Sequence, residues 1–187
     1  AVNGMVKAHR LAYHAIHQND AQSKVSFNWY TAEWALRGLM DVGSESEAEK
    51  AVKGDDGGML NAMASENGKR TIDYVSFDYY CKLSMKQLLN LPRVDKWEVY
   101  PVGMYNALKR FHARYKLPIL IAENGMATWD GAARPDRWTR SAYLVAHVKE
   151  MQRAMAEGVN VLGYVHWSIT DNYEWGTFSP RFGLFRV

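Results

Sequence analysis

The chain has 187 residues, of which 48% are hydrophobic and 23% are charged, and this composition is typical of one soluble globular domain spanning residues 1–187. Its formal net charge is only +3, with basic residues scattered among acidic ones, which argues against nucleic-acid binding. Charged residues interrupt every stretch long enough to enter a membrane, while a single cysteine, Cys81, and no apolar signal-peptide core in the first thirty residues favour a cytoplasmic protein.

The N-terminal part of the chain is predicted to form a helix followed by a strand. Small and apolar residues recur at helical spacing between residues 4 and 18, which indicates an amphipathic helix. The polar run at 18–24 ends this helix, and the β-branched and aromatic residues at 25–30 are typical of a short buried strand. A second helix is expected to begin near Ala32.

Residues 41–69 combine several glycines with many charged side chains. This composition predicts a loop, with one helical segment at residues 46–53.

From residue 72 onward, strand and helix patterns alternate. Strands are predicted at 72–80, 118–122 and 159–167, and a helix with proline in its first turn at 101–115. Another helix ends near Gly158, and one face of it carries Leu144, Val148, Met151 and Met155. Strands separated by helices indicate a parallel α/β sheet, but four strands are too few to close a (β/α)8 barrel, which takes about 250 residues.

Two segments that follow predicted strands carry residue types suited to carbohydrate chemistry. Glu123 comes directly after the apolar strand at 118–122, and an aromatic and acidic loop at 167–175 follows the last strand. Barrel active sites are built from the loops after the strands, so a carboxylate there is a candidate catalytic group. Taken alone, a Glu at a strand end is weak evidence, and Glu123 is then more simply a solvated loop carboxylate, while Trp167 and Trp175 are equally consistent with core or rim aromatics.

Two long segments and several shorter ones match known motifs. The Ile-Ala-Glu-Asn-Gly segment at 121–125 is similar to a nucleophile motif, and residues 163–175 with 181–184 are similar to a last-strand motif. Shorter matches lie at residues 8–13, 73–80, 97–103 and 143–147. Together these motifs resemble glycoside hydrolase family 1, the β-glucosidases and β-glycosidases. The resemblance implies the TIM (β/α)8 barrel of that family, present here as a partial barrel of about four β/α units.

The resemblance also implies hydrolysis of a β-glycoside or oligosaccharide by the retaining double-displacement mechanism, on β-D-glucosides or β-D-galactosides. Such enzymes hold two carboxyl groups about 5 to 5.5 Å apart, a nucleophile and an acid/base. Glu123 matches the nucleophile, which needs a hydrogen-bond donor and nearby positive charge to stay ionised. Tyr80 matches the family tyrosine that donates to it, whereas strand alternation points Tyr79 away from the barrel mouth.

Four more residues match the sugar-binding positions of the family. Trp167 matches the platform under the sugar ring, and Glu174 the carboxylate that accepts hydrogen bonds from the 4- and 6-hydroxyls. Trp175 is expected to donate its indole N–H to a ring hydroxyl, and Phe182 to lie near the sugar C6. A carboxylate at Glu174 repels a 6-phosphate, which favours plain glycosides over the alternative, a 6-phospho-β-glycosidase. No cofactor and no metal are implied.

Several departures from the family pattern limit what this chain can do alone. The Asn-Glu-Pro segment that carries the acid/base glutamate is absent, so that carboxylate is expected outside this chain. Asp78 stands where the family usually has Asn, which puts a second anionic group near Glu123. The loop at 176–180 is one residue shorter than the common pattern.

Three interpretations of the partial barrel stay open. The chain is part of a longer enzyme, a half that assembles with a complementary half or as a homo-oligomer, or a half barrel kept for sugar binding or structure without catalysis. An open sheet presents unpaired backbone groups at both edges, which favours association with another polypeptide.

Other candidate sites carry weaker patterns. His14 and His17 have a spacing that two metal ligands can share, and residues 55–58 superficially suggest a calcium loop, but neither has the further ligands such sites need. Cys81 is expected to be a packing residue, because no base that would activate its thiol is evident.

Overall fold

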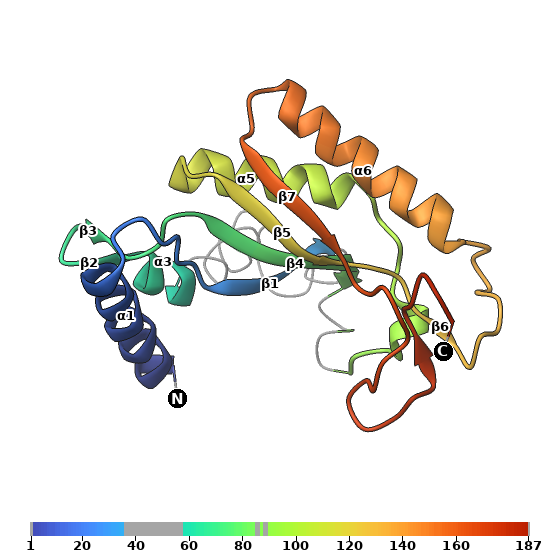
Figure 1. The fold of residues 1–187 in the computed structure, drawn as a ribbon. Helices are drawn as coiled ribbons and strands as arrows, with labels where there is room; N and C mark the ends of the chain where they lie inside the picture. The colour runs from blue at the N-terminus through green and yellow to red at the C-terminus, as the bar shows by residue number, and fades with distance from the viewer. Residues whose placement is uncertain (1, 36–57, 85–86, 88–89, 187) are drawn as a thin grey trace, which may run out of the picture.

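Four parallel strands form the sheet that carries the candidate catalytic residues (Figure 1). They are β1 (Asn28–Ala35), β4 (Val75–Ser84), β5 (Ile119–Asn124) and β7 (Val161–His166), and they lie in the order β1-β4-β5-β7. Each neighbouring pair is parallel, so the predicted α/β architecture with a parallel sheet is confirmed.

The computed structural model describes residues 2–35, 58–84, 87 and 90–186. The helical segment predicted at residues 46–53 lies outside these ranges.

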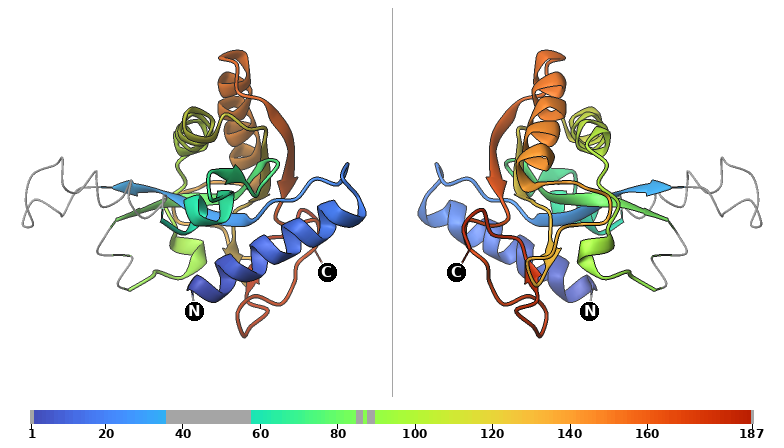
Figure 2. Two further views of the ribbon diagram at one scale, coloured as in Figure 1. Left: turned by 90° about the vertical axis from the view of Figure 1, so that its left-hand side faces the viewer. Right: turned by 90° about the vertical axis from the view of Figure 1, so that its right-hand side faces the viewer.

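Helices α5 (Val102–Tyr115) and α6 (Arg140–Ala156) connect β4 to β5 and β5 to β7, and Figures 1 and 2 show both on the same side of the sheet. Their apolar faces pack on the strands because every crossover must bury its hydrophobic stripe. The main core that results is made of fully buried residues from the strands and α5, including Phe77, Met104, Leu108, Phe111, Ile119 and Ile121. This core holds the carboxyl ends of β4, β5 and β7 in fixed relation.

The C-terminal half follows the predicted pattern closely. Pro101 caps α5, Thr139 caps α6 by accepting a hydrogen bond from the Ala142 N–H, and Gly158 follows α6 with a φ of +89°. A 3-10 turn, η1 (Val94–Lys96), precedes α5. A short antiparallel ribbon of β6 (Thr128–Trp129) and β8 (Pro180–Arg181) lies beyond the carboxyl end of the sheet (Figure 1).

In the N-terminal half, two predicted strands form with shifted bounds, and one predicted helix is wrong. The strand expected at 25–30 runs instead from Asn28 to Ala35, and no helix begins near Ala32, because residues 31–35 continue the parallel pairing with β4 and Ala32 is buried. The strand expected at 72–80 begins at Val75 and continues to Ser84.

The loop predicted for residues 41–69 is also wrong over its described part. Residues 58–64 form helix α3 (Gly58–Ala64), which packs against α1 (Val2–Asn19). A hairpin of β2 (Ser65–Glu66) and β3 (Lys69–Arg70) follows, and its two turn residues, Asn67 and Gly68, both have positive φ. An Asn-Gly pair supplies this turn at little steric cost. The helix forms because Leu60, Met63 and Ala64 are buried on one face.

Within the described ranges, no helix combines the length and the apolarity that crossing a bilayer requires.

A buried hydrogen-bond network joins α6 to the carboxyl ends of β4 and β5. The Tyr143 hydroxyl, on a fully buried side chain of α6, donates to the Tyr80 carbonyl oxygen at 2.9 Å and accepts from Nδ2 of Asn124 at 2.9 Å. Nδ2 of Asn124 also donates to the Tyr79 carbonyl oxygen at 2.6 Å. The residues on either side of the site are therefore fixed by one buried hydroxyl and one buried amide.

We expect Tyr143→Phe to lower the free energy of unfolding by about 1–3 kcal/mol, because it leaves buried polar partners short of a hydrogen bond. Urea unfolding of the chain, followed by circular dichroism, measures the change. The matched control is Tyr105→Phe, which removes an exposed hydroxyl bonded to Glu157 and should cost much less. Equal stability of Tyr143→Phe and the parent chain would contradict the proposed role of the network.

Candidate active site

Glu123 lies at the carboxyl end of β5, where the strand contains an irregularity. Phe77 of β4 faces Ile121, but the next residue, Asp78, faces Glu123, so β5 has one extra residue at this point. Such bulges are common beside active sites, because they re-aim the side chain that follows. Here the bulge brings Glu123 opposite Asp78.

The residues after Glu123 fix its backbone. Asn124 is fully buried, its Oδ1 accepts from the Tyr164 hydroxyl at 2.7 Å, and its carbonyl oxygen accepts from the Trp167 N–H at 3.0 Å. A Cβ at Gly125 would overlap the Trp167 carbonyl oxygen. The Glu-Asn-Gly segment is thus explained residue by residue: the amide crosslinks strands and the glycine admits a neighbouring backbone.

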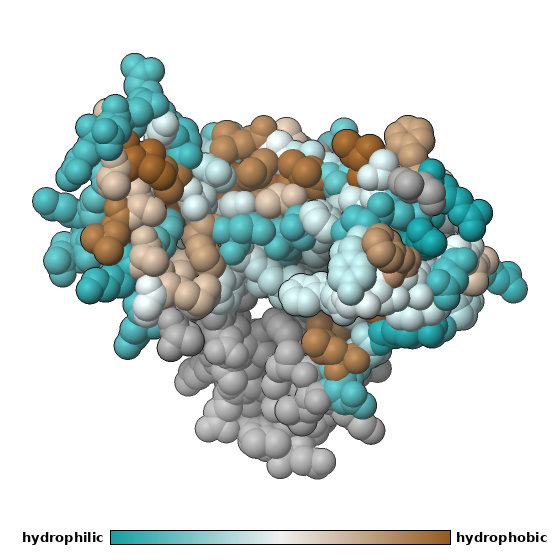
Figure 3. Space-filling view, turned by 60° about the horizontal axis from the view of Figure 1, so that its bottom comes forward, coloured by the Kyte–Doolittle hydropathy of each residue, from teal (hydrophilic) through white to brown (hydrophobic). Residues whose placement is uncertain are grey.

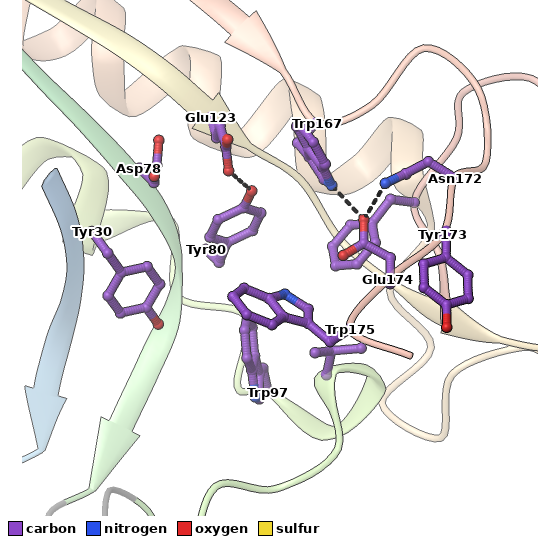
Figure 4. Close-up of a pocket in the computed structure, with 12 residues that line it drawn as sticks. Tyr30, Asp78, Tyr80, Trp97, Glu123, Trp167, Asn172, Tyr173, Glu174 and Trp175 are labelled. Atoms are coloured by element: carbon purple, nitrogen blue, oxygen red, sulfur yellow. Dashed lines mark hydrogen bonds between the residues drawn. The ribbon is translucent and has the colours of Figure 1, made fainter. Parts of the chain in front are cut away.

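Tyr80 donates a short hydrogen bond from its hydroxyl to Oε2 of Glu123 (Figure 4). Tyr79, its neighbour on β4, is fully buried on the other face, and its hydroxyl donates to the Tyr100 carbonyl oxygen at 2.6 Å. Strand alternation separates the two hydroxyls, so the expectation that Tyr79 points away from the site is confirmed.

A cavity of about 530 Å³ opens in front of Glu123 and Tyr80. All six residues singled out in the sequence as catalytic or sugar-binding line it: Glu123, Tyr80, Trp167, Glu174, Trp175 and Phe182. The other lining residues are Tyr30, Asp78, Val94, Trp97, Asn172 and Tyr173. Figure 4 shows Glu123, Tyr80 and Asp78 on one side and the residues of the loop after β7 on the other.

The wall opposite Glu123 is organised around Glu174, which is 8% exposed. Its Oε1 accepts from the Trp167 indole N–H at 2.8 Å and from Nδ2 of Asn172 at 2.7 Å. These two donors hold the carboxylate and the Trp167 ring together at the cavity wall. A carboxylate beside a flat aromatic face is suited to bind a polar ring that has both hydroxyls and C–H groups.

Aromatic side chains form much of the remaining wall. The ring of Tyr80 lies edge-on to those of Trp97 and Phe182, with centroids 5.9 and 6.0 Å away, and it stacks on Tyr30 at 6.4 Å. Trp97 and Tyr30 were not identified as site residues from the sequence. The end of the strand predicted at 25–30 was the available signal for Tyr30, and the motif match at 97–103 was the available signal for Trp97.

Trp175 differs from the other lining residues because its side chain is 98% exposed, at a backbone φ of +47°. It lies at the rim, where the cavity meets an apolar groove of about 520 Å³. The groove shares Tyr30, Val94, Trp97 and Glu174 with the cavity, and Leu83, Leu91 and Trp129 extend it outward. The two hollows together offer a polar pocket with an apolar continuation.

Electrostatically the cavity is acidic. Burial raises the pKa of Asp78 to about 6, the negative charge of Glu123 adds to this rise, and two hydrogen bonds from Asn28 oppose it. Burial and the bond to Glu123 raise the pKa of the Tyr80 hydroxyl well above its usual value, so Tyr80 remains a donor. No described residue that lines the cavity carries a positive charge, so this part of the chain lacks the cation expected beside Glu123.

The histidine pair considered as metal ligands is used otherwise. His14 contacts Glu66 at 3.1 Å and His17 contacts Asp73 at 3.2 Å, which ties α1 to the hairpin and to the segment before β4. Among the residues that the structure describes, no three His, Cys, Asp or Glu side chains are arranged to hold one ion. Cys81 is buried with Ala32, Leu83 and Phe182 in a cluster behind the cavity, as expected of a packing residue.

The sequence and the structure of this chain were compared with those of known proteins. The model of glycosyl hydrolase family 1 matches residues 81–187. The β-galactosidase of Sulfolobus acidocaldarius is 45% identical over 109 residues, which cover 57% of this chain and 21% of that protein. The β-galactosidase of Saccharolobus solfataricus is 36% identical over 170 residues, which cover 85% of this chain and 33% of that protein. The chain thus spans a third or less of these curated relatives.

Solved structures show the same relation. A hyperthermophilic β-glucosidase superposes on the whole chain with a TM-score of 0.78 and 32% identity, and the chain covers 44% of it. A family 1 β-glucosidase from Thermotoga maritima gives a TM-score of 0.75 at 25% identity, with 51% of its length covered. The open four-stranded sheet is therefore part of a TIM barrel, as the sequence motifs predicted. Because the family model matches more than half of its residues, the chain belongs to glycosyl hydrolase family 1.

Proposed function

We propose that this chain supplies the nucleophile and much of the sugar-binding wall of a retaining β-glycosidase that hydrolyses β-D-glucosides or β-D-galactosides. The observation that carries the proposal is the hydrogen bond from Tyr80 to Glu123 at the end of β5, inside a cavity walled by aromatic side chains and Glu174. A carboxylate held in this way at the mouth of a barrel strand suits attack on an anomeric carbon.

In the first step, Glu123 attacks the anomeric carbon and the bond to the leaving oxygen breaks, which gives a glycosyl ester. Tyr80 keeps the other carboxylate oxygen oriented while the attacking oxygen reacts. In the second step, water hydrolyses the ester and regenerates the carboxylate. The acid/base carboxyl that serves both steps comes, in this proposal, from a polypeptide segment outside the 187 residues.

The wall around Glu174 determines which sugars fit. Glu174 would accept hydrogen bonds from the 4- and 6-hydroxyls, with Trp167 under the ring, Phe182 near C6 and Trp175 at the rim. A 6-phosphate there would meet a buried carboxylate, so we favour plain glycosides over phosphorylated ones. The apolar groove beyond Trp97 would receive the leaving group of the substrate.

The partner that completes the site is proposed to be a complementary half barrel. In the described part of the chain, β1 and β7 form the edges of the sheet and have strand neighbours on one side only. Figure 3 shows separate groups of hydrophobic residues exposed on one face of the molecule. Several large apolar side chains on or just after β7 are exposed, among them Leu162, Val165 and Ile169. Pairing of these edges would satisfy their backbone groups and cover this apolar surface.

We expect a 2-deoxy-2-fluoro-β-D-glucoside with a dinitrophenolate leaving group to form a stable ester on Glu123, because this leaving group departs without an acid catalyst. Intact mass and peptide mapping detect the adduct. Glu123→Gln should abolish it, and should lower turnover of the completed enzyme by about three orders of magnitude or more. The control Glu150→Gln, on the outer helix α6, should label normally.

The rival interpretation, a sugar-binding half barrel without catalysis, predicts a different result. The parent chain and Glu123→Gln would then bind glucose-like ligands with equal affinity, and neither would form an adduct.

Tyr80→Phe should slow adduct formation by about tenfold to a hundredfold, because Tyr80 orients the Glu123 carboxylate and a misaligned nucleophile reacts slowly. Affinity for the probe should change much less, since the Tyr80 ring stays in place. Rates and affinities are separated by varying the probe concentration, and Tyr105→Phe on α5 serves as the control. An unchanged labelling rate in Tyr80→Phe would remove Tyr80 from the mechanism.

Mixing the chain with a polypeptide that carries the first four strands of a family 1 barrel should give a one-to-one complex that labels faster than the chain alone. Light scattering after size-exclusion chromatography measures the mass. Val165→Lys on edge strand β7 should weaken the complex by about tenfold or more, because it charges a surface buried on association. Val102→Lys, at an exposed valine of α5, is the matched control. A compact monomer that ignores the second half would contradict the proposal.

A further inference from the structure

Asp78 lies beside Glu123 and has hydrogen-bond donors of its own. The two residues face each other in the parallel pairing of β4 with β5, and both line the cavity (Figure 4). On the other side, Nδ2 of Asn28 on β1 donates to both carboxyl oxygens of Asp78, at 2.9 and 2.8 Å. The Ser76 hydroxyl donates to Oδ1 of Asn28 at 3.1 Å, which fixes the amide so that its NH₂ group points toward Asp78.

The groups around Asp78 leave its charge poorly compensated. From β5 it faces the carboxylate of Glu123, from its own strand Tyr80, and from β1 the neutral Tyr30 and Asn28. Across the cavity lies a third carboxyl group, Glu174. Among the described residues that line the cavity, no Lys, Arg or His is present to offset these negative charges.

Ionisation of Glu123 therefore makes ionisation of Asp78 less favourable, because the two negative charges repel each other. Burial, and then the charge of Glu123, raise the pKa of Asp78 to about 6, although the Asn28 amide favours its ionised form. An Asp in this position changes its charge close to neutral pH, whereas an exposed Asp titrates near 3.9.

We propose that Asp78 is the electrostatic counterpart of the nucleophile: its negative charge favours ester formation, and it carries the negative charge at the base of the cavity once Glu123 has become a glycosyl ester. This inference rests on the proposed function of Glu123. It assigns to Asp78 an effect on the reaction that acts through Glu123 and through the charge of the sugar, not through contact with the leaving group.

The charge changes in this step balance. A bond forms between a Glu123 oxygen and the anomeric carbon, and the bond from that carbon to the leaving oxygen breaks and gives its electron pair to the leaving group. Glu123 loses its negative charge, so the repulsion that kept a proton on Asp78 falls. Below about pH 6, a protonated Asp78 then releases this proton to solvent and becomes the anion of the pair; above that pH, Asp78 is already ionised and remains the anion of the pair.

The same coupling sets the sign of the pH dependence. An ionised Asp78 raises the energy of the ionised nucleophile, and it stabilises the positive charge that develops at the anomeric carbon in the transition state. Both effects lower the barrier to ester formation. Ester formation should therefore become faster as the pH rises through about 6, where Asp78 ionises.

The first test needs no catalysis. Carbon-13 NMR of the Asp78 carboxyl follows its titration in the parent chain and in Glu123→Gln, whose neutral amide imitates the charge of the ester. We expect the midpoint to fall in Glu123→Gln, by about half a unit or more, and to stay unchanged in the control Glu150→Gln on α6. The same midpoint in Glu123→Gln as in the parent chain would overturn the inference, whatever the labelling experiments show.

The second test measures the labelling rate against pH with the dinitrophenyl 2-fluoro-glucoside. The parent chain should show a rise with a midpoint near 6, and the isosteric variant Asp78→Asn should lack this rise and label more slowly at pH 8, by about tenfold. An identical rise in Asp78→Asn would overturn the inference. Absence of any adduct at every pH, with a normal shift of the NMR midpoint, would instead count against the proposed function alone.

Discussion

The buried amide of Asn124 is the interaction on which the site depends. It donates to the Tyr79 carbonyl oxygen of β4 and to the Tyr143 hydroxyl of α6, and it accepts from the Tyr164 hydroxyl of β7. Three elements thus converge on the residue next to Glu123. The bulge in β5 is stable because these bonds replace the regular pairing that the extra residue interrupts. Loosening this amide would therefore misplace Glu123 before it weakened the rest of the sheet.

The cavity combines rigid aromatic walls with three carboxyl groups, and the combination has a physical logic. A reaction that develops positive charge on a sugar ring is favoured by negative groups that are already in place. Such groups repel one another, so each must be held by neutral donors: Glu123 by Tyr80, Glu174 by Trp167 and Asn172, and Asp78 by Asn28. Neutral donors orient a carboxylate and leave its negative charge in place. A salt bridge would offset that charge.

How far the sequence predicts this molecule depends on how local each signal is. Helices α5 and α6 and strands β5 and β7 were predicted because proline, glycine and apolar periodicity mark them within short windows. The helix expected near Ala32 was wrong because pairing with β4 overrides the local pattern there. The loop predicted for residues 41–69 followed from the many glycines and charged residues there. That composition hid the helical spacing of Leu60, Met63 and Ala64, which are buried. Glu123 and Trp167 were candidates because they stand at the ends of predicted strands, and both line the cavity, whereas Trp97 reaches the cavity through tertiary packing that its motif match at 97–103 does not specify.

The burial of Cys81 gives the molecule a built-in chemical reporter. It is the only cysteine in the sequence, its thiol is fully buried behind Tyr80, and burial raises its pKa to about 12, so it is inert in the closed sheet. A thiol reagent can reach it only while β4 separates from the cluster around Phe182. The rate of Cys81 alkylation therefore reports how often the strand that carries Asp78 and Tyr80 opens. The free energy of this local opening can be calculated from that rate, without any introduced label.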